Sequence, residues 1–99
     1  MRLIFEWDAN KAIINLTKHK VSFEESKTFF NDPLLVTFLD ERHSDTEERL
    51  ISIGISAHNR ILLVVHADRR ETADNVIIRI INCRKTTPSE RKTYKEGKY

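Results

Sequence analysis

The chain has 99 residues, the length of one domain with one hydrophobic core, so we expect a single domain over residues 1–99. An apolar fraction of 39% argues against disorder, and no segment approaches the ~18 to 20 apolar residues of a membrane span. The single cysteine excludes an internal disulfide, and the N-terminus lacks the pattern of a secretory signal. The sequence therefore predicts a cytoplasmic protein without a membrane partner.

The N-terminal third predicts a strand followed by two helices. The strand is expected at residues 3–5, and apolar residues at helical spacing predict the first helix over 9–19. Asp8 is placed to cap that helix. Ser22 opens a capping box that predicts a second helix over about 23–30.

The rest of the chain predicts four strands and a last helix. The strands are expected at residues 34–39, 50–56, 61–67 and 76–83. Their short connections favour antiparallel neighbours. Thr87 and Glu90 form a capping box around Pro88, which starts a helix that runs to about Lys95. The order predicts an α+β fold, with an antiparallel sheet of four to five strands packed with two N-terminal helices and one C-terminal helix.

Charge is unevenly distributed, although the net charge is only +2. Residues 40–48 carry a local net charge of −4, and residues 79–99 carry a local net charge of +5. This asymmetry predicts an acidic loop and a separate basic face, although solvated surface charge explains it equally well.

Arg79 is the most informative cation, because it lies inside an otherwise apolar strand. A guanidinium there needs an anion or water as partner, so it either handles phosphate or makes a structural ion pair with Glu48 or Asp68. Strand alternation places Arg79 on the same face as Cys83, which we interpret as a small core residue.

Strand geometry predicts which other cations lie near Arg79. The turn at 57–59 places Arg49 and Arg69 across from each other, so these two and Arg79 are expected to converge. Arg84 is expected farther away, as a phosphate ligand or as surface charge. Tyr94 either joins the basic edge or packs in the core.

Several motifs occur in order along nearly the whole chain. They include Phe5-Glu-Trp-Asp8, Lys18-His19, Val21-Ser-Phe-Glu-Glu25, Val65-His-Ala-Asp-Arg69 and Ile78-Arg-Ile-Ile-Asn-Cys-Arg84. Together they resemble the BrnT family, the toxin halves of bacterial type II toxin–antitoxin pairs. The resemblance implies a RelE-like fold, a ribonuclease activity without metal or other cofactor, and a BrnA-like antitoxin as partner. It also implies contact with DNA only through the antitoxin complex.

A ribonuclease of this kind uses the ribose 2′-OH as nucleophile, so it needs a base and cations that stabilise the phosphorane. The candidate catalytic residues are Glu48, Arg49, Arg69, Arg79, Arg84 and Tyr94. Glu48 and His43 are the candidate bases. The histidines and the lone cysteine show no zinc-ligand spacing.

Two functions fit these observations. The first is a ribonuclease toxin that cleaves RNA, inhibits translation and is silenced by its antitoxin through the acidic loop 40–48 and the helix 88–95. The alternative is a non-catalytic module that uses the same basic face to bind nucleic acid or an acidic protein.

Overall fold

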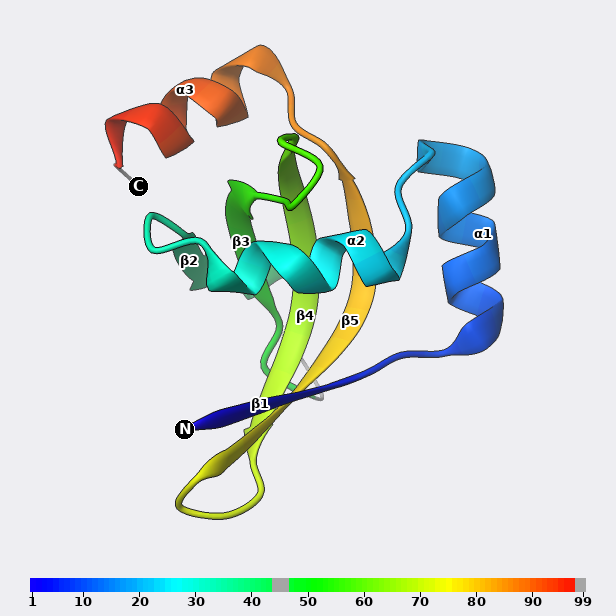
Figure 1. The fold of residues 1–99 in the computed structure, drawn as a ribbon, viewed down its shortest axis with the longest axis vertical. Helices are drawn as coiled ribbons and strands as arrows, with labels where there is room; N and C mark the ends of the chain where they lie inside the picture. The colour runs from blue at the N-terminus through cyan, green and yellow to red at the C-terminus, as the bar shows by residue number, and fades with distance from the viewer. Residues whose placement is uncertain (44–46, 98–99) are drawn as a thin grey trace.

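The computed structural model describes residues 1–43 and 47–97. Within these ranges five strands form one sheet in the order β1-β5-β4-β3-β2 (Figure 1). The strands are β1 Arg2–Glu6, β2 Val36–Leu39, β3 Leu50–Ile55, β4 Ile61–Arg70 and β5 Asn75–Lys85. The helices are α1 Ala9–His19, α2 Phe23–Thr28 and α3 Pro88–Glu96, with short 3-10 turns η1 Phe29–Asn31 and η2 Glu41–His43.

The predicted α+β fold is confirmed, with one difference in the sheet. Strands β2 to β5 pair antiparallel with their neighbours in sequence, as their short connections require. Strand β1, however, pairs parallel to β5, so the sheet is mixed. The apolar pattern of a short strand indicates that it pairs but not in which direction, because direction depends on the path of the chain between the strands.

The helices begin where the capping residues predict. Asp8 accepts a hydrogen bond from the backbone N–H of Lys11 at 3.0 Å, and the Ser22 hydroxyl accepts one from Glu25 at 3.0 Å. Helix α1 ends as predicted at His19, where Lys20 takes a left-handed conformation with φ of 61°. The second helix ends at Thr28, two residues earlier than expected, and continues as η1.

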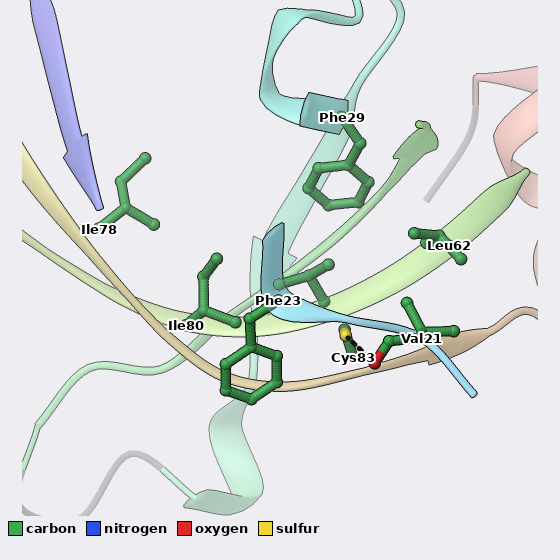
Figure 2. Packing of buried hydrophobic residues seen from close by; sticks show 8 residues of the cluster. Val21, Phe23, Phe29, Leu62, Ile78, Ile80 and Cys83 are labelled. Atoms are coloured by element: carbon green, nitrogen blue, oxygen red, sulfur yellow. Dashed lines mark hydrogen bonds between the residues drawn. The ribbon is translucent and has the colours of Figure 1, made fainter. Parts of the chain in front are cut away.

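The core lies between the helices and one face of the sheet. Figure 1 shows α2 lying across the sheet and α1 beside β5. Figure 2 shows the buried cluster, which consists of Val21, Phe23, Phe29, Leu62, Val64, Ile78, Ile80 and Cys83. Each large apolar side chain buried in this way contributes about 1.5 to 3 kcal/mol. The prediction that Cys83 is a core residue is confirmed, and burial raises the pKa of its thiol to about 11.

A β-bulge in β5 changes which side chains share a face. Val65 pairs with Asn82 but His66 pairs with Ile80, so Ile81 is an extra residue without a partner on β4. The bulge turns Cys83 onto the core face with Ile80, while Arg79 faces the opposite side. The prediction that Arg79 and Cys83 share a face is therefore wrong, because strict alternation cannot anticipate an inserted residue.

After Leu50, the β3 residues on the core face are the small Ser52 and Gly54. Ser52 and Gly54 are buried there, and a Cβ atom on Gly54 would lie 2.5 Å from Leu35 Cδ1. The Ser52 hydroxyl lies 2.7 Å from His66 Nε2, and His66 Nδ1 lies 2.6 Å from Asp68 Oδ1. This order resembles a hydrolase triad, but Ser52 is fully buried, so no substrate reaches it. His66 is the hydrogen-bonded structural histidine of a polar core network.

None of the helices in the described ranges has the length and apolar character needed to cross a membrane.

Candidate functional site

The site is built on a row of side chains that crosses the outer face of the sheet, opposite the buried core. Glu6 of β1 pairs with Arg79 of β5, and Arg79 pairs with Ala67 of β4. Leu50 of β3 pairs with His66 of β4, and the two strands are antiparallel. Arg49, just before Leu50, therefore lies across from Ala67, just after His66, and continues the row. Paired residues share a face and neighbouring strands lie about 4.8 Å apart. The small side chain of Ala67 therefore leaves room for the two arginines to approach each other.

A cavity of about 480 Å³ opens over this row. We call it the arginine cavity. It is lined by Glu6, Trp7, Asp8, Lys11, Glu47, Arg49, Arg79, Ile80 and Ile81. The lining residues come from the end of β1 with the first turn of α1, from the approach to β3, and from the bulged part of β5, so three segments distant in sequence build one site.

Glu47 lies between the two arginines that line this cavity and contacts both of them. Its carboxylate forms an ion pair and hydrogen bond with the Arg79 guanidinium, and its Oε1 lies 4.0 Å from Nε of Arg49. Arg79 thus has the ion-pair partner that a cation in a strand requires, but that partner is Glu47 rather than Glu48 or Asp68. Glu48 is exposed just before β3, and the side chain of His43 lies outside the described part of the structure.

Arg69 lies at the edge of the same charged region. It lines a second hollow of about 250 Å³ together with Glu47, Ala67, Asp68 and Arg79. Its guanidinium donates two hydrogen bonds to Glu6, at 3.1 and 3.2 Å. These bonds are the largest cause of a lowered pKa of the Glu6 carboxyl, and the charge of Arg79 adds to it. Arg49, Arg69 and Arg79 thus lie around one region of the sheet, as strand geometry predicted.

Arg84 lies on the same face but farther along β5, where it pairs with Leu63. Its guanidinium donates two hydrogen bonds to Glu90, at 2.8 and 2.9 Å, and so connects β5 to the first turn of α3. Arg84, with help from the backbone of Thr87, lowers the pKa of Glu90 to about 2. The structure therefore does not bring Arg84 to the arginine cavity.

Tyr94 also lies outside that cavity. Its hydroxyl donates a hydrogen bond of 2.5 Å to Asp32, which also accepts the backbone N–H groups of Leu34 and Ile55. Burial and the neighbouring Asp32 carboxylate raise the pKa of Tyr94 to about 12. The contact attaches α3 to the turn before β2. Catalytic roles for Arg84 and Tyr94 stay predictions.

Sequence reasoning missed the two acidic partners of the site. The sequence indicates Glu6 only as part of the first motif, and Glu47 only as part of the acidic loop. The alternation of β1 places Glu6 on the face of Ile4, which is a usable signal once β1 is paired with β5. Glu47 gives no comparable signal, because it lies in an irregular segment before β3. Among the described residues no three His, Cys, Asp or Glu side chains are gathered as a metal site.

Comparison with known proteins identifies the family. The sequence profile described as "Ribonuclease toxin, BrnT, of type II toxin-antitoxin system" matches residues 7–90, which is most of the chain. The chain belongs to the BrnT family of ribonuclease toxins. The family is defined by type II toxin–antitoxin pairs, so an antitoxin partner follows from membership.

A solved structure agrees with the fold of this BrnT family member. The crystal structure of the Brucella abortus ribonuclease toxin BrnT is similar with a TM-score of 0.61, over 88% of this chain and 99% of that chain. The sequence identity is 20%, so this likeness concerns the fold. No curated protein sequence matches this chain.

Proposed function

We propose that this BrnT family member is a metal-independent endoribonuclease that inhibits translation by cleaving RNA at the arginine cavity. The observation that carries the proposal is the arrangement of Arg49, Arg79 and Glu47 in one accessible cavity. Two guanidinium groups can hold a phosphodiester, because their planar forks match its oxygens. A carboxylate between them provides the base that such chemistry needs.

The proposed reaction is an internal transfer at phosphorus. The 2′-oxygen of the ribose forms a bond to phosphorus, and the bond from phosphorus to the 5′-oxygen of the next nucleotide breaks. Glu47 accepts the proton of the 2′-OH, and the leaving 5′-oxygen takes a proton from solvent. The products are a 2′,3′-cyclic phosphate and a 5′-hydroxyl, and no oxidant or metal is needed to balance the step.

The arginines supply the stabilisation that a metal ion supplies in other nucleases. Negative charge builds on the non-bridging oxygens in the transition state, and preorganised cations beside them lower its free energy. Arg79 and Arg49 line the cavity, and Arg69 adds positive charge in the neighbouring hollow. Each is held by an internal carboxylate in the free protein. When RNA binds, its phosphate must therefore displace those carboxylates or bind the guanidinium groups together with them.

Glu47 is the better base than the predicted Glu48, because Glu47 lines the cavity and contacts Arg79. Arg84 and Tyr94 have no part in the proposed step. Their hydrogen bonds to Glu90 and Asp32 support a role in positioning α3.

The proposed partner is a BrnA-like antitoxin, with DNA bound only through the complex in the cytoplasm. The acidic segment around η2 precedes β3, whereas α3 follows the other end of β5. In the register Leu50 lies beside His66, and Lys85 lies beside Leu62. A partner that contacts both charged segments therefore has to extend along the sheet. Co-expression with the neighbouring gene product should give a complex that purifies through a tag on one chain.

The experiment that tests the site compares Arg79→Ala with Arg70→Ala. Arg70 is an exposed arginine at the end of β4 that donates a hydrogen bond to the Ala73 carbonyl, so it is a matched control. We expect Arg79→Ala to lower RNA cleavage by about 100-fold or more, the usual loss for one transition-state donor. Arg70→Ala should retain activity close to that of the natural chain.

The circular dichroism spectra of both variants separate loss of the site from loss of the fold. Full activity of a folded Arg79→Ala variant would remove the arginine cavity from the mechanism. RNA binding without cleavage by the natural chain would instead favour the non-catalytic binding module.

A further inference from the structure

A further hollow lies between α1 and β5, beside the arginine cavity. Its volume is about 290 Å³. We call it the α1 groove. Its walls include Lys11, Ile14, Lys18 and His19 of α1, and Ile81 and Asn82 of β5. Lys11 and Ile81 line both hollows, so the α1 groove adjoins the arginine cavity along one side of α1.

The bulge and the helix spacing explain why the two hollows adjoin. Ile81 is the extra residue of the bulge and lies where the two hollows meet. Lys11, Ile14 and Lys18 are three and four residues apart, so they lie on one face of α1. The distance along the helix from Lys11 to Lys18 is about 10 Å. That is the length of roughly two to three nucleotides of a stacked strand.

The chemistry of the groove combines apolar and cationic groups. Ile14 is 63% exposed and lies beside Ile81, which gives the groove an apolar surface. Lys11 and Lys18 provide ammonium groups, and the exposed Asn82 provides a carboxamide with both donor and acceptor. Apolar surface for a base, cations for phosphate and an amide for a base edge are the groups that single-stranded nucleic acid requires.

We infer that the α1 groove is a second RNA-binding subsite that holds a nucleotide flanking the cleaved bond. This inference rests on the proposed function of the arginine cavity. Lys18 binds a flanking phosphate, and Ile14 and Ile81 contact the base next to it. RNA is favoured over a protein segment because the groove adjoins the cavity that is proposed to hold the scissile phosphate, and because Lys11 and Lys18 lie along its length.

The experiment compares two substrates and two lysine variants. A dinucleotide contains the cleaved bond but is too short to reach Lys18, whereas an octanucleotide extends along α1. Lys18→Ala should lower kcat/KM for the octanucleotide by about tenfold through KM, the loss expected for one charged contact, and leave the dinucleotide unchanged. It should also reduce the salt dependence of octanucleotide binding by about one phosphate contact, a slope change of about 0.7. Lys92→Ala, an exposed lysine of α3, should change neither.

Three results would overturn the subsite. The first is an equal loss on both substrates, and the second is no loss on either. The third is unchanged RNA binding with weaker capture of the co-expressed antitoxin, which would make the groove a protein interface. If the natural chain cleaves neither substrate, the proposed function fails. Binding of a fluorescent octanucleotide then decides the subsite separately, and Lys18→Ala must still weaken it.

Discussion

Asn15 offers a direct test of how α1 is held against the bulged strand. It is 5% exposed, and its side chain makes three hydrogen bonds with the backbone. Nδ2 donates to the carbonyls of Val21 at 3.0 Å and Cys83 at 2.8 Å, and Oδ1 accepts the Cys83 N–H at 3.1 Å. These bonds satisfy the N–H and carbonyl of Cys83, just after the bulge, and the Val21 carbonyl between α1 and α2.

The change Asn15→Ala leaves those backbone groups buried without this partner. Each lost bond costs about 1 kcal/mol, and an unsatisfied buried group adds to that cost. Alanine favours the helix by about 0.6 kcal/mol, which offsets part of the loss. We therefore expect the free energy of unfolding to fall by about 3 kcal/mol, which lowers Tm by about 12 to 24 °C in a domain of this size.

The assay is urea denaturation followed by circular dichroism, in an Arg79→Ala background so that toxicity does not limit expression. Asn10→Ala is the matched control, because Asn10 is an exposed asparagine in the same helix. It should change stability by less than about 0.5 kcal/mol. Equal stabilities for the two variants would refute the role of the Asn15 network.

Three other predictions follow from the site and from α3. Glu47→Gln should lower the rate of RNA cleavage by about 100-fold, because the base is lost. It should leave RNA binding in a fluorescence assay equal or tighter, because an anion is removed from Arg79. An unchanged cleavage rate would exclude Glu47 as the base. Tyr94→Phe should lower stability in urea by about 1 kcal/mol through the lost bond to Asp32 and leave the cleavage rate unchanged, whereas a rate loss in the folded variant would give Tyr94 a catalytic role. Because the pKa of Glu90 is lowered to about 2, chiefly by Arg84, this carboxylate stabilises the fold above its ordinary pKa of 4.5 and loses the effect as the pH falls toward 2. After screening at the surface, we expect the Glu90 carboxylate to contribute about 1 kcal/mol to the free energy of unfolding. Glu90→Gln should therefore reduce by that amount the loss of urea stability between neutral pH and about pH 2. The same loss in both chains would contradict the ion pair.

Local sequence signals predicted most of the fold, because each has a local physical cause. Asp8, Ser22 and Thr87 cap helices through hydrogen bonds within three residues, so their positions can be read from the chain. The parallel pairing of β1 with β5 depends on contacts between residues more than 70 positions apart, such as Leu3 and Val76. No local pattern encodes such a pairing.

The site was only partly predictable for the same reason. Arg79 was found because a cation in an apolar strand demands a partner, and Arg49 and Arg69 because hairpin geometry places them nearby. Its partner Glu47 could not be chosen over Glu48, because neither lies in a strand whose alternation fixes its direction. The α1 groove depends on the bulge at Ile81, which strict alternation also misses.

The measurement that tests the central claim most directly is cleavage of a defined RNA by the purified chain in EDTA. A matched substrate carries a single 2′-deoxy nucleotide at the cleaved position, and mass spectrometry identifies the ends of the products. The account predicts cleavage of the RNA to a 2′,3′-cyclic phosphate in EDTA and no cleavage of the deoxy substrate at that bond. Loss of activity in EDTA that magnesium restores, or cleavage of the deoxy substrate, would contradict it.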